Sequence, residues 1–229
     1  MFRKTGLILV SLIPLAKLRI CCYKLFFGFD IGKNARIAML NFLDIKTLVM
    51  GDNAEIRGFG NIFMSINRLE MQPFSKIGAP RVGLNLFRGT ANKKDYPQSV
   101  LKIGNGSAIE LFHYFDLCGD IIIGDNVIIG GIKSVFFTHT FHKQEFKPIV
   151  IGSNSYIGTN CLFQMGVVIP EDSIVAMGSV VTKRFEQPQC LIAGVPAKIV
   201  KTEIDHSQEE AFKLRNKPFF KDGEFVISQ

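Results

Sequence analysis

The sequence predicts an all-β fold, a left-handed parallel β-helix with an N-terminal helical segment and a short C-terminal helix. The first observation is a six-residue repeat: from residue 151 the chain reads IGSNSY, IGTNCL, FQMGVV, IPEDSI, VAMGSV and VTKRFE. The second is that the same phase recurs upstream. A period of six belongs to neither a helix nor a single strand, and it is typical of a coil made of three short, flat strands.

Each unit of the repeat begins with a large apolar residue and has a smaller one four positions later. The large residues are Ile151, Ile157, Phe163, Ile169, Val175 and Val181, and the smaller ones are Ser155, Cys161, Val167, Ser173 and Ser179. We expect the large side chains to fill the axis of the coil and the small ones to fit near a corner. Glycine and asparagine in the same units, at 152, 154, 158 and 160, supply the left-handed backbone that tight corners require.

The upstream segments continue the repeat in groups of three. These are Ile31, Ile37 and Leu43; Met50, Ile56 and Ile62; Ile103, Ile109 and Phe115; and Ile123, Ile129 and Val135. We therefore predict a β-helix domain over 31–201. An ordinary β-rich domain with accidental spacing would explain one pair of hexads, but six consecutive hexads argue strongly against it.

Two stretches break the period and are predicted to leave the coils. Residues 66–100 contain three prolines, Pro73, Pro80 and Pro97, and a Lys-Lys-Asp run, and residues 136–148 read FFTHTFHKQEFKP between two regular segments. Long loops that leave a rigid scaffold are frequent places for functional residues.

Residues 1–30 form an apolar and basic segment at the N-terminus. Its basic start and short apolar run resemble a signal peptide, but no A-x-A cleavage site follows. Lys17, Arg19 and Lys24 interrupt the apolar run before it reaches the roughly 20 residues that a spanning helix needs. We interpret residues 2–27 as helical segments broken at Pro14, which either pack on the body or make a peripheral contact with the inner face of the membrane. A cleaved signal peptide is the less favoured third alternative.

Residues 202–229 form a C-terminal tail after the turn-rich AGVPAK at 193–198. Within it, residues 207–216 (SQEEAFKLRN) predict a short helix, with Ser207 as N-cap and two glutamates in the first turn.

Composition narrows the class of protein without choosing a function. The chain has 229 residues, of which 47% are hydrophobic, which is enough for one sizeable domain. Five cysteines without a CxxC pair suggest reduced thiols in a cytoplasmic protein rather than a zinc knuckle or a redox pair. The net charge of +7 suits an anionic partner, and nucleic acid, a membrane surface and a phosphate-rich cofactor all qualify.

The stretch IGSNSYIGTNCLFQMGVVIPEDSIVAMGSVVTK, followed by IAGVPAKIVK, resembles the hexapeptide-repeat acyltransferases, and among them the galactoside, maltose and capsule or lipopolysaccharide sugar O-acetyltransferases. The resemblance extends over residues 101–201, and over 30–65 in the repeat alone. It implies a homotrimer with active sites between subunits, acetyl-CoA as acyl donor beside the coils, and a hydroxyl of a sugar or polysaccharide precursor as acceptor. It implies neither a metal nor a nucleic-acid partner.

By this resemblance, His139 in the THTFH loop stands where the family's catalytic histidine stands, give or take one residue. A sugar hydroxyl is a poor nucleophile, and an imidazole with an ordinary pKa of about 6.5 can take its proton near neutral pH. His142 is the second candidate for the general base. The remaining alternative is that His139 is a surface histidine without a catalytic role.

Four residues are predicted to bind the acceptor: Glu110, His113, Asp116 and His142. Glu110 stands where the sugar acetyltransferases commonly have asparagine, which is a departure from the family pattern at the acceptor site. Asp116 could orient the imidazole or hold a sugar hydroxyl. His113 is either a substrate contact or, the favoured interpretation, a packed residue of the coil.

The resemblance also assigns a set of residues to acetyl-CoA. These are Gly158, Thr159, Ala176, Met177, Gly178, Thr182, Lys183 and Lys198. Backbone amides at small-residue corners can bind the pantetheine arm, and lysines can neutralise phosphates. The two lysines are the more informative, because the coil itself demands glycine and small residues but not lysine.

Other functions on the same fold stay open. A zinc enzyme resembling the γ-class carbonic anhydrases would use three histidines, for which His113, His139 and His142 are the candidates. The position of His139 and His142 on an extruded loop favours acyl transfer instead. An N-acetyltransferase acting on an amino sugar, and a catalytically inactive scaffold, are the further alternatives.

Overall fold

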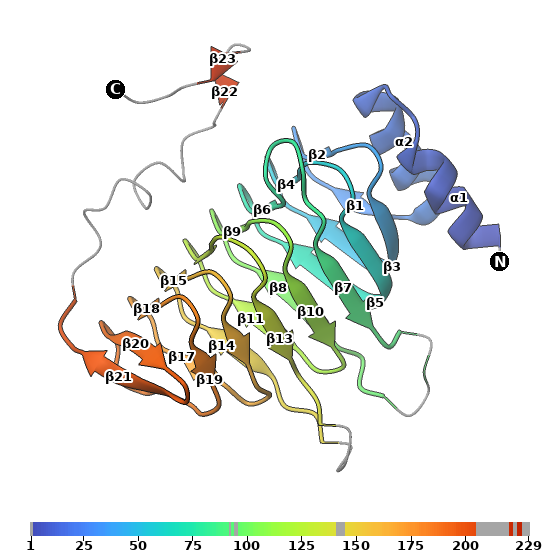
Figure 1. Ribbon diagram of the computed structural model, residues 1–229. Helices are drawn as coiled ribbons and strands as arrows, with labels where there is room; N and C mark the ends of the chain where they lie inside the picture. Colours follow the sequence, from blue (N-terminus) through green and yellow to red (C-terminus); the bar gives the residue numbers. More distant parts are fainter. Residues whose placement is uncertain are drawn as a thin grey trace.

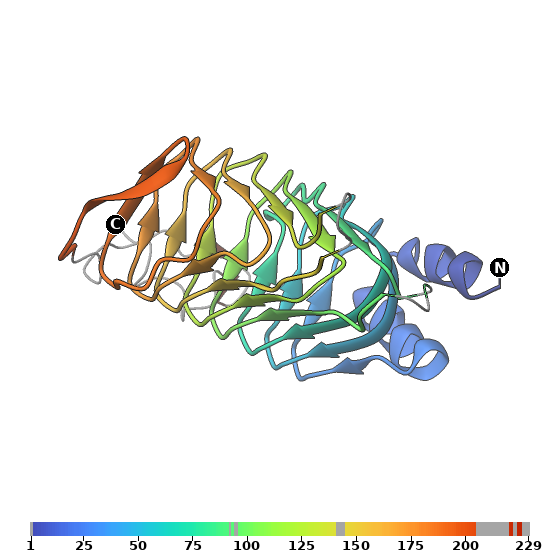
Figure 2. The ribbon, with the colours of Figure 1, turned by 90° about the horizontal axis from the view of Figure 1, so that it is seen from below.

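The protein folds as the predicted left-handed parallel β-helix, in which three columns of short strands form the faces of a prism (Figure 1). The structure is a computed structural model that describes residues 2–91, 93, 96–140, 145–204, 220–221 and 224–225. Two helices, α1 (Phe2–Ser11) and α2 (Ala16–Phe27), lie at the N-terminal end of the stack (Figures 1 and 2). The predicted C-terminal helix at 207–216 falls outside the described residues.

The first and second faces begin as continuous strands and then separate. The long strands β3 (Phe42–Met50) and β5 (Ile62–Met71) run along both faces, so that β5 pairs with β7 through its beginning and with β8 through its end. The first face continues through β7 (Leu86–Gly89), β10 (Tyr114–Leu117), β13 (Val135–Phe137), β16 (Leu162–Phe163) and β19 (Val180–Val181). The second face comprises β1 (Asp30–Ile31), β8 (Val100–Ile103), β11 (Ile121–Ile123), β14 (Ile149–Ile151) and β17 (Val168–Ile169).

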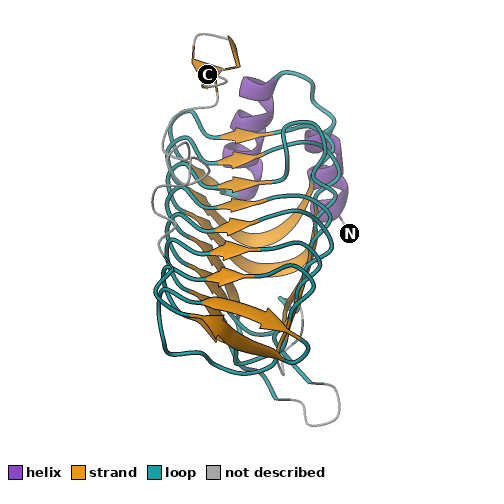
Figure 3. Ribbon diagram, turned by 60° about the vertical axis from the view of Figure 1, so that its left-hand side comes forward, coloured by secondary structure: helices purple, strands orange, loops and turns teal. Residues whose placement is uncertain are grey.

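The third face is a separate sheet, which Figure 3 shows as a ladder of short arrows. It comprises β2 (Arg36–Ile37), β4 (Glu55–Ile56), β6 (Lys76–Ile77), β9 (Ala108–Ile109), β12 (Ile128–Ile129), β15 (Tyr156–Ile157), β18 (Ile174–Val175) and β20 (Leu191–Gly194). The antiparallel strand β21 (Ala197–Lys201) closes it. In the tail, β22 (Phe220–Lys221) pairs with β23 (Glu224–Phe225).

The core is a set of inward-pointing columns, one from each face. The first face contributes an aromatic column of Phe63, Phe87, Phe115, Phe136 and Phe163. Successive rings stack with centroids 4.4–4.9 Å apart, which is the spacing between neighbouring strands. The other two faces contribute mainly isoleucine. Parallel strands in exact register therefore turn the sequence repeat into continuous stacks of like side chains.

The small residues of the repeat lie at the corners of the coil, as predicted, and they are buried there. Ser155, Cys161, Val167 and Ser173 are fully buried, and Ser179 is 1% exposed. Asn154 and Asn160 have φ angles of 56° and 58°, so the corners do use left-handed backbone.

The predicted inward residue is wrong by one position in two coils. Ile62 and Val135 were expected in the core, but Ile62 is 41% exposed and Val135 is half-buried, while Phe63 and Phe136 are fully buried. In both coils the step from the preceding core residue spans seven residues instead of six. The extra residue is taken up in the corner, and it moves the next side chain to the opposite side of its strand.

The predicted excursion over 66–100 is too wide. Residues 66–77 stay in the stack, because β5 and β6 keep parallel partners on both sides. Pro73 causes no departure since it sits in a corner, where no strand partner needs its missing N–H. Within the described residues, the long departures from the coils lie between the end of β7 and the start of β8, and between β13 and β14.

The N-terminal helices are attached to the first coils by one side. Leu7, Val10 and Tyr23 are buried, and the guanidinium of Arg19 donates hydrogen bonds of 3.0 and 2.7 Å to the carbonyl of Ile37. Gly28, at φ 66°, ends α2 with a left-handed turn. Among the described residues, no helix has the length and apolar character needed to cross a membrane.

Candidate active site

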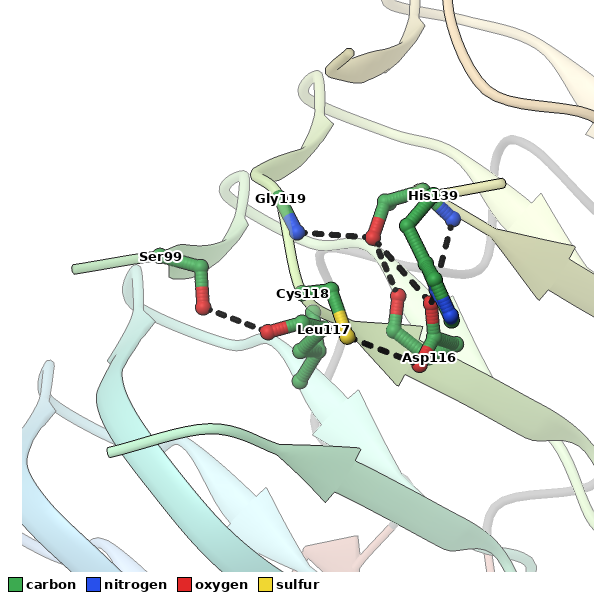
Figure 4. Close-up of polar contacts among 7 residues, drawn as sticks. Ser99, Asp116, Leu117, Cys118, Gly119 and His139 are labelled. Carbon is green, nitrogen blue, oxygen red and sulfur yellow. Dashed lines mark hydrogen bonds and ion pairs between the residues drawn. The ribbon is translucent and has the colours of Figure 1, made fainter. Parts of the chain in front are cut away.

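A polar cluster lies where the first face turns into the second, at the ends of β10 and β13 (Figure 4). The two strands are adjacent and parallel, with Asp116 opposite Phe137. Thr138 and His139 follow immediately after β13. Strand register thus brings His139 beside a carboxylate that precedes it by 23 residues in the sequence.

Asp116 and His139 form a short, largely buried hydrogen bond. Nδ1 of His139 lies 2.5 Å from Oδ2 of Asp116, and the two side chains are 10% and 3% exposed. An ionised carboxylate only accepts hydrogen bonds, so Nδ1 carries the hydrogen and Nε2 holds the lone pair of the neutral ring. This is the tautomer that a general base needs.

Further contacts hold the Asp116 carboxylate in place. The Cys118 thiol donates to Oδ1 at 3.3 Å, and the Thr138 hydroxyl donates to the Asp116 carbonyl at 2.7 Å. The same hydroxyl accepts the Gly119 N–H at 2.7 Å. Burial, reinforced by the charge of Asp116, raises the pKa of Cys118 to about 12, so the thiol remains protonated and acts as a donor. The imidazole of His139 is therefore hydrogen-bonded to a carboxylate whose orientation is itself restrained.

The two excursions from the coils converge on His139. His139 and Phe146 form an antiparallel bridge at the base of the second excursion, and their rings lie 6.4 Å apart. Phe146 also contacts Tyr96 of the first excursion, with ring centroids 5.2 Å apart in an edge-to-face arrangement. Both excursions project from the same side of the stack (Figure 1). His139 is thus flanked by both departures from the repeat.

The other predicted acceptor residues do not join this cluster. His142 lies outside the described residues. Glu110 and His113 lie before β10, at the corner between the third and first faces, whereas Asp116 and His139 lie at the other edge of the first face. The Glu110 carboxylate lies 3.9 Å from Nη2 of Arg57.

His113 belongs to a buried polar ladder that runs along its corner. Asn61 donates to Asn41 at 2.8 Å, Asn85 donates to Asn61 at 3.0 Å, and the His113 N–H donates to Asn85 at 2.8 Å. The ladder continues where the Ser134 N–H donates to Nδ1 of His113 at 3.1 Å. His113 is 1% exposed, and burial lowers its pKa to about 4. These contacts support a packing role for His113.

His113→Asn is expected to make the protein less sensitive to acid. The unfolded chain binds a proton at His113 below about pH 6.5, while the folded chain does not until about pH 4. Stability therefore falls as the pH falls through this window, by up to about 3 kcal/mol from this one group. Asparagine extends the ladder and removes the titrating group. Urea unfolding at pH 7.5, 5.5 and 4.5 should show a shallower decline for the variant, and an unchanged slope would contradict this account.

Most residues assigned to acetyl-CoA line the corner between the third and first faces. These are Gly158, Thr159, Ala176, Met177 and Gly178, with Lys198 nearby on β21, where it pairs with Ala193. A Cβ on Gly158 would lie 2.7 Å from the backbone nitrogen of Met177, and Gly178 has a φ of 72°. The coil itself therefore excludes a side chain at Gly158 and favours glycine at Gly178. Met177 is 73% exposed, so this corner presents a surface to solvent.

Thr182 and Lys183 lie on the other edge of the first face, which they share with His139. They follow β19, two strands along from β13, and neighbouring strands lie about 4.8 Å apart. Thr182 is therefore about 10 Å from the strand that leads into His139. Both side chains are exposed, and Nζ of Lys183 lies 5.3 Å above the Phe185 ring. The predicted cofactor residues are thus divided between two edges of one subunit.

The cluster of Asp116, Cys118 and His139 also offers the atom types that bind zinc, all within 4.8 Å of one another. These atoms already hydrogen-bond to each other, so a zinc ion would have to replace both hydrogen bonds. The three-histidine set is not assembled in the described part of the subunit, since His113 lies at a different corner. The geometry favours a hydrogen-bonded dyad over a metal centre.

Cys118, Thr138 and Tyr96 belong to the site but were not predicted from the sequence. A signal existed for Cys118, because side chains two residues apart in a strand point the same way, and Cys118 follows Asp116 by two. Thr138 directly precedes the predicted base. Nothing local identifies Tyr96, whose place depends on how two excursions meet.

Comparison with known sequences confirms the predicted resemblance. Residues 148–183 match the family model described as the hexapeptide repeat of succinyl-transferase. The galactoside O-acetyltransferase of Escherichia coli K12 is 34% identical over 101 residues, which cover 41% of this chain and 49% of the relative. A putative acetyltransferase of Staphylococcus aureus is 39% identical over 80 residues, which cover 31% of this chain and 39% of the relative. The chain thus spans about half, or less, of the length of these relatives.

Solved structures support the fold. A polysialic acid O-acetyltransferase superposes with a TM-score of 0.52 at 22% identity, over 80% of this chain and 90% of that one. A second acetyltransferase, specific for polysialic acid, superposes with a TM-score of 0.50 at 19% identity, over 77% of this chain and 82% of that one. At sequence identities this low, the structural similarity establishes the β-helix fold alone.

Proposed function

We propose that this chain transfers an acetyl group from acetyl-CoA to a hydroxyl of a sugar or polysaccharide precursor, with His139 as the general base. The observation that carries the proposal is the 2.5 Å hydrogen bond from His139 to the buried Asp116, on a fold shared with sugar O-acetyltransferases. Three of the four similar proteins named above act on carbohydrate, as their names state: a galactoside in one case and polysialic acid in two.

The proposed reaction moves one proton through the imidazole. Nε2 of His139 takes the proton of the acceptor hydroxyl as its oxygen attacks the thioester carbonyl, and a tetrahedral intermediate forms. When the intermediate collapses, the carbon–sulfur bond breaks and the imidazolium returns the proton to the leaving thiolate. Asp116 stabilises the imidazolium between these two steps and holds the ring in the required tautomer.

A neighbouring subunit would explain why the predicted site residues lie on two edges of one prism. Lys183 and His139 share one edge, while Lys198 and the corner around Gly158 lie on the other. In a three-fold assembly, one edge of each subunit can face the opposite edge of its neighbour, which would bring the two sets together.

The expected assembly is therefore a homotrimer whose activity depends on association. Light scattering of the purified protein should give three times the chain mass of 25.6 kDa, and dilution below the association range should abolish turnover. A monomer that remains fully active would contradict this arrangement.

Lys183→Ala and Lys198→Ala are each expected to raise KM for acetyl-CoA more than they lower kcat. A lysine that binds a remote phosphate contributes equally to the ground and transition states, so its removal weakens binding without slowing the chemical step. Lys201→Ala, also on β21 and exposed, is the matched control and should leave KM unchanged. An unchanged KM in both test variants would place the cofactor elsewhere.

The decisive assay for the proposed function is thioester consumption with acetyl-CoA across a panel of acceptors. Free sugars, nucleotide sugars and polysaccharide fragments test the O-acetyl proposal, and amino sugars test N-acetyl transfer. Turnover with an amino sugar alone would replace the hydroxyl by an amine as acceptor. A metal content near one zinc per subunit, with loss of activity on chelation, would favour the carbonic-anhydrase-like alternative.

A further inference from the structure

The N-terminal helices expose an unusual share of the large apolar side chains. Of twenty that are exposed among the described residues, eight lie between residues 2 and 26, which is about a tenth of the chain. These are Phe2, Ile8, Leu9, Leu12, Leu15, Leu18, Leu25 and Phe26, with exposures from 48% to 95%. Leu7, Val10 and Tyr23 pack the helices on the coils. The exposed apolar side chains take no part in this attachment.

The same segment is strongly basic. Residues 1–29 contain five lysines and arginines and no aspartate or glutamate. Arg19 is buried and holds the segment to the body, but Lys17 and Lys24 are exposed on α2 beside the apolar side chains. Exposed apolar side chains interspersed with lysines, on helices of 10 and 12 residues, are typical of a segment that lies in a membrane interface without crossing it.

A basic pocket opens at the junction of the helices and the first coils. It has a volume of about 610 Å³, and its charged lining residues are Arg3, Lys4, Lys46 and Asp44. Lys4 and Arg3 lie 3.1 and 3.5 Å from the Asp44 carboxylate, whose side chain is 9% exposed. One carboxylate faces three cationic groups, so the pocket retains an excess of positive charge next to the apolar surface.

We propose that α1, α2 and this pocket form a docking surface for an anionic lipid bilayer. The exposed apolar side chains enter the boundary between headgroups and acyl chains, Lys17 and Lys24 lie among the headgroups, and the pocket accepts one lipid phosphate at Lys46. The charge argues for lipid over a second copy of this chain. Two copies joined through this face would bring their basic residues together, whereas an anionic surface neutralises them.

The test is sedimentation of the full-length protein with vesicles. Vesicles of phosphatidylcholine with about 30% phosphatidylglycerol should bind it at low salt, and pure phosphatidylcholine should bind it much less. Binding should weaken with added salt, because screening reduces the attraction. Lys17→Glu, Lys24→Glu and Lys46→Glu should each lower the partition coefficient about fivefold or more, since one basic residue near the surface contributes about this factor.

The apolar contribution is tested with Leu9→Glu and Leu25→Glu, at side chains 61% and 73% exposed. Both should lose vesicle binding and keep the mass of the parent protein in light scattering. Val200→Glu and Lys201→Glu, at the opposite end of the stack, introduce the same charge changes as controls and should bind as the parent does. Acetyl transfer to a water-soluble acceptor, measured without vesicles, tests the proposed function separately.

Two results would overturn the docking proposal. One is a full-length protein that does not sediment with the anionic vesicles at low salt. The other is a change of oligomeric mass in Leu9→Glu or Leu25→Glu with vesicle binding intact, which would assign the face to contacts between copies of this chain.

Discussion

His139→Ala is expected to reduce kcat by about 10²–10⁴-fold, the usual cost of losing a general base. Without the imidazole, no group at the ends of β10 and β13 has a lone pair positioned to take the acceptor proton, since Asp116 is buried beneath the ring. Binding of acetyl-CoA should be unchanged, because Lys183 and the corner amides are untouched. Steady-state kinetics with saturating donor, together with calorimetric titration of CoA, would measure both quantities.

The alanine variant leaves Asp116 without its partner, so a second variant is needed to separate catalysis from stability. His139→Asn offers an amide that can donate to the carboxylate but cannot act as a base. It should remain as inactive as the alanine variant while unfolding at a temperature closer to that of the parent. His142→Ala should be clearly milder than either. If His139→Ala turns over normally while His142→Ala or His113→Ala is inactive, the fold assignment stands and the assignment of the base is wrong.

Asp116→Asn is expected to lower kcat by about 10²-fold or more, with little change in KM for acetyl-CoA. An amide can present its NH₂ group to the ring and favour the tautomer in which Nε2 carries the hydrogen, and it no longer stabilises the imidazolium. Asp116 acts through His139, so it is a positioning residue. The loss should therefore appear in kcat while KM for acetyl-CoA stays near that of the parent, because the ring loses its orientation and the cofactor contacts remain.

Asp120→Asn is the matched control for this substitution. Asp120 lies in the turn after β10, and its carboxylate accepts the Val100 N–H at 2.8 Å instead of contacting His139. It should lower stability slightly and leave kcat and KM as in the parent. If Asp116→Asn and Asp120→Asn have equal effects, or if Asp116→Asn lowers only the unfolding temperature, Asp116 has a structural role alone. Cys118→Ala, which removes one donor to the carboxylate, should reduce kcat less than Asp116→Asn does.

The repeat by itself determined the coil architecture of this protein. A large residue every sixth position and a small one between them can bury both sets only when the chain winds into stacked three-strand coils, so the buried positions of Ile157, Ser155 and Ser173 were readable from spacing alone. The break in the repeat also located the loop that carries His139. These features are local, because each depends on residues a few positions apart.

The tertiary structure alone decided which residues meet between coils. Asp116 and His139 are 23 residues apart in the sequence. Their contact depends on how many residues lie in the corners and excursions of each coil. The six-residue period does not determine the number of corner residues. One extra residue in a corner, for example, places Phe136 in the core instead of Val135. The same dependence assigned His113 to the asparagine ladder and joined Tyr96 to Phe146. Contacts across coils follow from parallel register, and register is established only when all the coils pack together.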